Sequence, residues 1–164
     1  MSYYKSRGSW VIYLSFLIGI ILQIMPWPQQ IDMFQPSCSW LLLIFIYWVM
    51  ALPHRVNLGT GFILGLITDL LLGSTLGIHS LGMSMIAYLV TIKFQTFRNM
   101  ALWQQTLFVI LLSIIMTITV FLTEFLIIHV SFNTEIFSNA LINGIVWPWL
   151  FLLMRKTRRK FLVQ

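Results

Sequence analysis

The sequence predicts an all-α membrane protein, a single bundle of six short transmembrane helices with both termini in the cytoplasm. Composition is the first reason: 59% of the 164 residues are hydrophobic, 9% are charged and the mean hydropathy is +0.91, which is unlike an ordinary soluble domain. The second reason is that the apolar residues form six runs, separated by residues that interrupt helices. The third is that basic and acidic residues fall in alternate loops.

The first three runs cover residues 10–25, 38–52 and 59–72. The first run resembles a secretory signal, but it ends at Pro26 rather than at a small-residue cleavage site, so we expect it to be retained. The second ends at Pro53 and the third at Gly73, and both residue types end helices. At about 1.5 Å per residue the third run reaches only about 20 Å, so length alone also allows a buried or re-entrant piece.

The last three runs cover residues 78–92, 102–130 and 136–154. The fourth begins after Gly77 and ends at Lys93, and the sixth ends where a basic cluster begins at Arg155. The fifth is the longest and is followed by polar residues 131–135. Because the six runs together use almost the whole chain, we expect one polytopic membrane domain over residues 1–164.

The distribution of charge argues that the runs cross a membrane, since Lys and Arg on short loops accumulate on the cytoplasmic side. With the N-terminus inside, all ten basic residues fall on the cytoplasmic side: Lys5, Arg7, Arg55, Lys93, Arg98, Arg155, Lys156, Arg158, Arg159 and Lys160. The opposite loops hold only Asp32 and Glu135. Adding or removing one span would break this separation, so it predicts six spans with both ends inside.

Small or polar residues recur on one helix face in five of the six runs, and close packing of such residues holds membrane helices together. The third run carries Gly61, Gly65 and Asp69 four residues apart. Its GxxxG motif favours either packing inside the bundle or a face for a partner helix. Thr117 in the fifth run and Asn143 in the sixth belong to similar stripes. The second run has no such stripe, which predicts a peripheral position.

Asp69 and Glu124 are the only carboxylates inside the apolar runs, and a charge in lipid is costly enough to make each a candidate for function. Both lie near the ends of their spans that face the outer side. There His79 and His129 are potential hydrogen-bond partners. The residues leave three interpretations open: a structural polar contact, a partner or ligand site, and chemistry.

No motif of an enzyme or of a metal centre is present. The sequence has no H-E-x-x-H, no G-x-S-x-G, no phosphate-binding loop that ends in Lys and Ser or Thr, and no Cys/His cluster. His54, His79 and His129 are far apart in the chain, and Cys38 is the single cysteine. We therefore expect no catalysis, no metal and no cofactor.

The formal net charge of +6 raises the question of nucleic acid, but the charges lie in loops between apolar runs, so we expect no nucleic-acid partner. Five basic residues follow the last run: Arg155, Lys156, Arg158, Arg159 and Lys160. Such a cluster contacts anionic lipid headgroups and orients the helix that precedes it. A specific cytoplasmic partner is the alternative.

Longer blocks of the sequence resemble the rod shape-determining MreD family of Gram-negative bacteria. The most extensive block is residues 51–62, which includes His54 and Arg55 and continues to Asp69 and residues 73–77. Further blocks are residues 23–28, 97–105, and 143–149 through to 155–156. The blocks occur in order along essentially the whole chain.

This resemblance implies a multi-pass component of the bacterial inner membrane that belongs to the cell-wall elongation machinery and has no catalytic activity. The implied partners are the bitopic protein MreC, the peptidoglycan synthase pair RodA and PBP2, and the actin-like MreB. Members of the family are similar to the substrate-binding S components of energy-coupling-factor transporters, with six helices around an outward-facing pocket. The outer-side positions of Asp69, His79 and Glu124 are compatible with that arrangement.

Two classes of function follow. The first is an interaction protein whose rigid bundle presents helix faces and the loop at residues 53–58 to partners. The second is a small-solute-binding component of a transporter, which would need a convergent polar pocket. The candidate interface or pocket residues are His54, Arg55, Gly61, Gly65, Asp69, His79, Thr117, Glu124 and Asn143.

Overall fold

The computed structural model describes residues 9–25, 39–128 and 135–160. Every regular element in these ranges is an α-helix: α1 Ser9–Ile24, α2 Trp40–Ala51, α3 Leu58–Leu72, α4 Ile78–Asn99, α5 Leu102–Ile128 and α6 Glu135–Lys160. The all-α class and the order of six helices in this part of the chain confirm the prediction. Predictions that involve Lys5, Arg7, Asp32, Cys38 and His129 fall outside the described residues.

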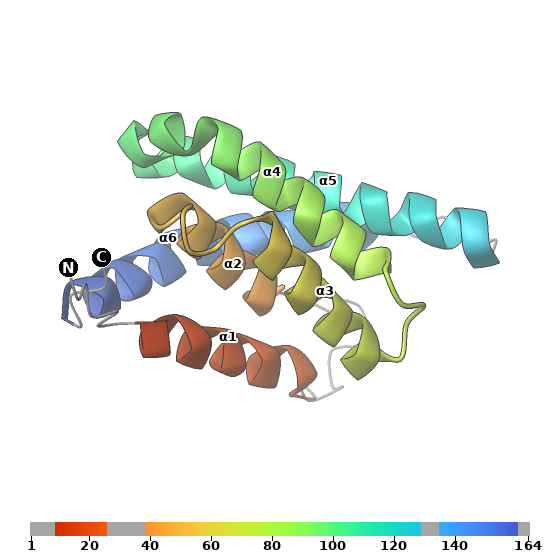
Figure 1. Cartoon of the computed structure of the whole chain (residues 1–164). Helices are drawn as coiled ribbons and strands as arrows, with labels where there is room; N and C mark the ends of the chain where they lie inside the picture. The colour runs from red at the N-terminus through yellow and green to blue at the C-terminus, as the bar shows by residue number, and fades with distance from the viewer. Residues whose placement is uncertain (1–8, 26–38, 129–134, 161–164) are drawn as a thin grey trace.

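Successive helices run in opposite directions, so the bundle has two distinct ends (Figure 1). Helices α2, α4 and α6 finish at the end shown on the left, which carries Arg55, Arg98 and the basic cluster of α6. We call this the basic end. The α3–α4 connection lies at the opposite end. Helix α3 packs most extensively on α4, and α5 on α6, while α2 contacts α1, α4 and α6.

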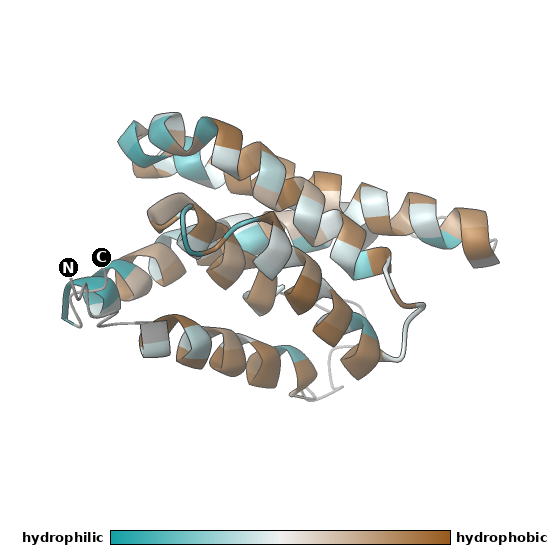
Figure 2. Ribbon diagram, in the orientation of Figure 1, coloured by the Kyte–Doolittle hydropathy of each residue, from teal (hydrophilic) through white to brown (hydrophobic). Residues whose placement is uncertain are grey.

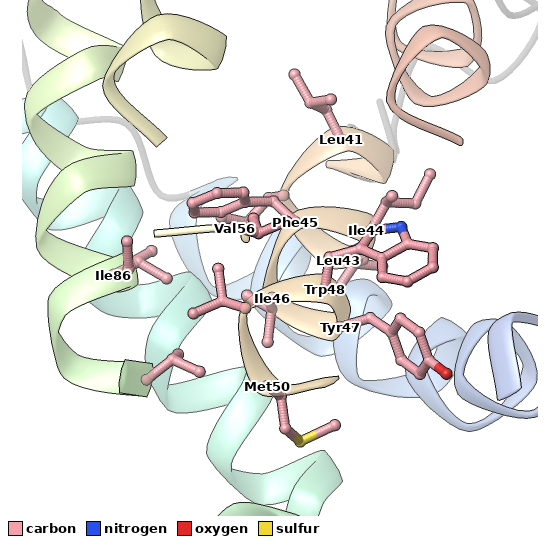
Figure 3. Close-up of a cluster of buried hydrophobic side chains, with 14 of the residues drawn as sticks. Leu41, Leu43, Ile44, Phe45, Ile46, Tyr47, Trp48, Met50, Val56 and Ile86 are labelled. Carbon is pink, nitrogen blue, oxygen red and sulfur yellow. The ribbon is translucent and has the colours of Figure 1, made fainter. Parts of the chain in front are cut away.

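Helix α2 is the core of the bundle, which corrects the predicted peripheral position. Every residue from Leu41 to Ala51 is buried, and Figure 3 shows several of these side chains, among them Phe45 and Trp48, directed into the space between α2 and the surrounding helices. The prediction relied on the lack of a small or polar stripe. A helix that is hydrophobic on all sides is instead the kind that neighbours surround.

Two helices are longer than their apolar runs. Helix α4 continues past the predicted end at residue 92 to Asn99, and α6 continues past residue 154 to Lys160. An apolar run ends where polar residues begin, but Lys, Arg and Gln are good helix formers. Basic residues also stabilise the last turn of a helix: Arg98 lies there in α4, and three basic residues lie there in α6. The remaining bounds agree with the prediction to within two residues wherever they are described.

Within residues 9–25, 39–128 and 135–160, one helix, over Leu102–Ile127, is long and apolar enough to cross a membrane by length and composition. Three shorter apolar helices in the same ranges cover Trp10–Ile24, Trp40–Ala51 and Leu58–Leu72. Figure 2 shows hydrophobic residues along the outward faces of the helices and hydrophilic residues gathered where α4 meets α5 and where α6 ends. The number of membrane crossings and their orientation stay predictions.

Two tryptophans and one serine show how the interior is organised. Trp48 and Trp147 are buried, as expected for tryptophans far from the ends of their runs. Trp149, for which the same position in the sequence predicts burial, is 83% exposed, because it lies on the opposite face of α6 from Trp147. The indole Nε1 of Trp48 donates a hydrogen bond to Oγ of Ser15 at 2.7 Å and thereby joins α2 to α1.

Candidate functional site

Asp69, at the end of α3, is the centre of a hydrogen-bonded cluster that closes the α3–α4 connection. Its Oδ1 accepts hydrogen bonds from Oγ of Ser74 at 2.9 Å and from the amide nitrogen of His79 at 3.1 Å, and it lies 2.7 Å from Nδ1 of His79. Its Oδ2 accepts from the amide nitrogen of Gly77 at 2.8 Å and from Oγ of Ser80 at 3.4 Å. The predicted contact between Asp69 and His79 is therefore confirmed.

The chain reaches this geometry because two glycines make the connection tight. Gly73 has a φ of 66° and ends α3 in the left-handed conformation, and Gly77 has a φ of 106° immediately before α4. The first amide groups of a helix have no partner inside that helix. In α4, those of Gly77 and His79 are directed to the Asp69 carboxylate, which also lies at the positive end of the helix dipole.

The chemical consequence is that Asp69 acts as a structural acceptor. Its side chain is 0% exposed and that of His79 is 20% exposed. Because a carboxylate accepts hydrogen bonds only, Nδ1 of His79 is assigned the proton in their contact. Both carboxylate oxygens already accept bonds from the chain itself, and no solvent reaches them. Of the three interpretations open to the sequence, this geometry favours the structural polar contact.

Gly61 and Gly65 lie on the same buried face as Asp69 and pack against α4. A Cβ on Gly65 would overlap the backbone of His79 and Ser80, and one on Gly61 would come within 2.7 Å of the Phe45 ring and 3.1 Å of the carbonyl oxygen of Met83. The GxxxG motif thus lets two helix backbones of this chain approach closely. Helix α4 covers the face that the motif could otherwise offer to a partner.

Asn143, on α6, joins three elements of the chain. Its Nδ2 donates to Oγ of Ser113 in α5 at 3.2 Å, and its Oδ1 accepts from the amide nitrogen of Ser39, the residue before α2, at 3.0 Å. Thr117 lies one turn after Ser113 and donates to that residue's own carbonyl oxygen at 2.9 Å. Asn143 is buried, so it contributes to the bundle's interior.

Glu124 is half-buried near the end of α5. Within the described residues, the hydrogen-bond donors to Asp69 come from residues 74–80, and Asp69, His79 and Glu124 do not form a cluster that could hold a metal ion. The predicted contact of Glu124 with His129 falls outside the described residues. The outward-facing pocket expected from Asp69, His79 and Glu124 stays a prediction.

His54 and Arg55 lie in the turn between α2 and α3 at the basic end. His54 is exposed, Arg55 is half-buried, and the Arg55 amide nitrogen donates to the carbonyl oxygen of Leu52 at 3.0 Å. The next residues begin α3: the side-chain oxygen of Asn57 accepts from the Gly59 amide at 3.1 Å. His54 thus stands on the surface, where its predicted role in contacts with partners is sterically possible.

A pocket of about 260 Å³ lies at the basic end, where α2, α4 and α6 finish and α5 begins. Three arginines line it, Arg98 from α4 and Arg155 and Arg158 from α6, together with Tyr47, Gln105 and Phe151. We call it the arginine pocket. Figure 3 shows Tyr47 extending from α2 toward α6, where its ring packs edge-on against Phe151 at 5.7 Å between centroids.

Sequence reasoning placed Arg155 and Arg158 in a general basic cluster and did not single out Arg98, Tyr47 or Gln105. The signal in the sequence was weak. Arg155 and Arg158 are three residues apart and so share a helix face, and Arg98 ends another helix on the same predicted side of the membrane. Only the packing of α4 on α2 and α5 brings Arg98 to the α6 arginines.

Among the described residues, no group of three or more His, Cys, Asp and Glu side chains lies close enough to hold a metal ion. The buried polar side chains of Ser15, Asp69 and Asn143 instead join helices to one another. Fold and site together define a class: a helical bundle with an apolar exterior, whose buried polar residues fix its own packing and whose basic residues gather at one end.

The chain belongs to the rod shape-determining MreD family. The sequence model of that family, described as rod shape-determining protein MreD, matches residues 4–157. The chain is also 43% identical over 152 residues to the rod shape-determining protein MreD of Haemophilus influenzae, a match that covers 92% of this chain and 93% of that protein. No solved structure matches the chain. Family membership places the function of this chain in the determination of cell shape.

Proposed function

We propose that the chain is a non-catalytic component of the bacterial cell-wall elongation complex that crosses the inner membrane six times with both termini in the cytoplasm. In this role it binds MreC directly and helps regulate or organise the peptidoglycan synthase pair RodA and PBP2, with MreB as an indirect partner. The observation that carries the proposal is the match to the rod shape-determining family over residues 4–157.

The surface of the bundle supports placement in a membrane. Large apolar side chains are exposed on several helices, including Tyr13 and Leu17 of α1 and Ile145 and Trp149 of α6, whereas a soluble protein rarely exposes large apolar patches. The basic residues in the described ranges gather at the end where α2, α4 and α6 finish. Such a separation agrees with a cytoplasmic basic end.

The state of the polar residues supports a scaffold rather than a catalyst. Asp69 is fully buried and accepts hydrogen bonds from its own chain. Asn143 similarly links α6 to α5 and to the start of α2. Groups held in this way give the helices fixed positions, and a fixed bundle presents defined faces to partner helices and to lipid.

A small-solute-binding role is the alternative, and it requires an outward-facing polar pocket. At the end of the bundle opposite the basic end, the side chains of His79 and Ser80 are hydrogen-bonded to Asp69. The amide of Gly77, in the α3–α4 connection, donates to the same carboxylate. This arrangement favours the scaffold role. The similarity to S components of energy-coupling-factor transporters stays a proposal that follows from the resemblance.

The experiment has two parts. The chain, tagged at its C-terminus and expressed from a plasmid in a rod-shaped host that lacks its own relative, should restore rod shape and co-purify MreC from detergent-solubilised inner membranes. Reporter fusions at both ends should give cytoplasmic signals. A correctly inserted protein that restores shape without any association with MreC would overturn the direct-binding role, and a periplasmic signal from either end would overturn the six-span orientation.

The faces that meet partners can be mapped with a photo-crosslinking residue at exposed apolar positions. Leu17 of α1, Leu111 of α5 and Ile145 of α6 sample three separate helices without disturbing the core. The scaffold role predicts that MreC is captured from one helix face and only lipid from the others. Equal capture of MreC at all three positions would indicate non-specific proximity and would contradict a defined interface.

A further inference from the structure

We infer that the arginine pocket binds the phosphate headgroup of an anionic phospholipid from the cytoplasmic leaflet. The pocket measures about 260 Å³ and lies between the ends of α2, α4 and α6 and the start of α5. The inference rests on the membrane placement proposed above and not on any protein partner. It assigns a specific site where the sequence predicted only general attraction between basic residues and lipid.

The charges of the pocket select an anion. Arg98, Arg155 and Arg158 line it, and no acidic residue does. Guanidinium groups bind phosphate oxygens through paired, charge-assisted hydrogen bonds. Three positive charges around one small pocket create a local potential that attracts an anion. A phosphate group offers several oxygens to such guanidinium groups.

The simpler explanation is that these arginines stabilise the carboxyl ends of the helices, which carry partial negative charge. At the end of α4 that task is performed by another residue. Nε2 of Gln105 donates to the carbonyl oxygen of Phe97 at 3.0 Å and to that of Met100 at 3.2 Å. Because Gln105 already donates to these carbonyls, capping of α4 alone does not account for Arg98 in the lining of the pocket.

The other side chains of the pocket select a lipid over a soluble anion. Met50, Ala51, Leu102 and Phe151 contribute apolar surface beside the arginines. A free phosphate gains nothing from such surface, whereas a phospholipid carries glycerol and acyl carbons next to its phosphate. Basic pockets between membrane helices on the cytoplasmic side are a recognised form of headgroup site.

The basic cluster of α6 divides into two sets, which supplies a matched control. Arg155 and Arg158 line the pocket. Lys156, Arg159 and Lys160 belong to the same helix end but are exposed and do not line it. General electrostatic attraction to a membrane depends on all five alike. A headgroup site depends on the first set only.

The test measures lipid bound to the purified full-length protein. The protein in nanodiscs of phosphatidylcholine is titrated with phosphatidylglycerol, and retained lipid is counted by native mass spectrometry. The double variant Arg98→Gln/Arg155→Gln should weaken phosphatidylglycerol retention by about 25-fold, at about fivefold per arginine. The control Lys156→Gln/Arg159→Gln removes the same charge and should change retention less than about twofold. Equal loss in both variants would overturn the site.

A charge-neutral variant keeps the test decisive if loss of two arginines unfolds the protein. Ala51→Leu narrows the pocket and retains every cation, so it should reduce retention of phosphatidylglycerol in protein that circular dichroism shows to be folded. Full retention by a folded Ala51→Leu protein would overturn the inference. So would displacement of the lipid by millimolar inorganic phosphate or by an acidic peptide, which would identify a soluble anion or a protein segment as the occupant.

Discussion

Gly65 of α3 lies directly against the backbone of Ser80 in α4: a Cβ on Gly65 would stand 2.5 Å from the amide nitrogen of Ser80 and 2.8 Å from the carbonyl carbon of His79. Side-chain atoms do not approach backbone so closely, and the backbone of a packed helix cannot move aside alone. Position 65 therefore holds the two helices at a distance that only glycine permits.

Replacing Gly65 should separate α3 from α4. We expect Gly65→Ala to lower the stability of the purified protein in detergent by about 1–3 kcal/mol, and Gly65→Leu to lower it further. Gly59→Ala is the matched control in the same helix, because a Cβ there meets only Oδ1 of Asn57, at 3.4 Å. Thermal unfolding followed by circular dichroism measures both. Equal melting temperatures for Gly65→Ala and Gly59→Ala would contradict the close contact.

The Asp69 cluster predicts an order of stabilities. Asp69→Ala removes the acceptor of every donor in the cluster, whereas His79→Ala removes one side-chain donor and keeps the backbone bonds. We expect Asp69→Ala to be the more destabilising, by about 1–3 kcal/mol for the buried donors left without a partner. Asp69→Asn should fall between the two, since an amide offers one accepting oxygen in place of two. A His79→Ala protein less stable than Asp69→Ala would show that the imidazole has a further role.

Rod-shape complementation distinguishes a scaffold from a chemical site. The scaffold role predicts that Gly65→Leu abolishes rod shape and association with MreC, because packing is the main term that joins membrane helices. Asp69→Asn should retain much of both, because it keeps the shape of the side chain. The opposite result would be a well-inserted Gly65→Leu protein that restores rod shape and binds MreC, together with an inactive Asp69→Asn protein at normal level. That result would refute the scaffold role and favour a chemical or ligand-binding role for Asp69.

Asn143 and Asn139 form a second matched pair, one turn apart on α6. Asn143 is bonded to Ser39 and Ser113, whereas the buried Oδ1 of Asn139 has no hydrogen-bond partner among the described residues. Asn143→Leu should cost about 1–3 kcal/mol because it leaves the part-buried amide of Ser39 and the buried hydroxyl of Ser113 without this partner. Asn139→Leu should cost less or stabilise the protein. Thermal unfolding measures the stability of both variants. A larger loss of stability in Asn139→Leu than in Asn143→Leu would contradict the structural role of the Asn143 hydrogen bonds.

Much of the fold was predictable because it depends on residues close in the sequence. The six apolar runs locate six helices, and Asp69 meets His79 because a short turn containing Gly73 and Gly77 joins their helices. The four-residue spacing of Gly61 and Gly65 likewise identifies a packing face. Local periodicity is sufficient for each of these features.

The rest depends on contacts between distant segments. Asn143 is 104 residues from Ser39, and residues of α2, α4, α5 and α6 line the arginine pocket. No local sequence pattern therefore predicts the Asn143 hydrogen bond or the pocket. The burial of α2 was also missed, because the stripe criterion identifies helices that pack on one face, whereas α2 packs on all of them. Trp149 shows the same limit: depth along a run does not give the direction of a side chain around the helix.

The hydrogen bond between Trp48 and Ser15 predicts a coupling that can be measured. Nε1 of the buried Trp48 donates to Oγ of Ser15, which itself donates to the carbonyl oxygen of Ile12 at 2.7 Å. Ser15→Ala should cost about 1–3 kcal/mol, because the indole N–H is left buried without an acceptor. In a Trp48→Phe background that N–H is gone, so the Ser15→Ala change should cost little stability, which gives an interaction energy of about 0.5–3 kcal/mol.

Ser84→Ala is the control for this cycle, since the Ser84 hydroxyl donates a hydrogen bond within its own helix, to the carbonyl oxygen of Ser80. Strictly additive losses in melting experiments on the double-mutant cycle would mean that the bond does not hold α1 on α2.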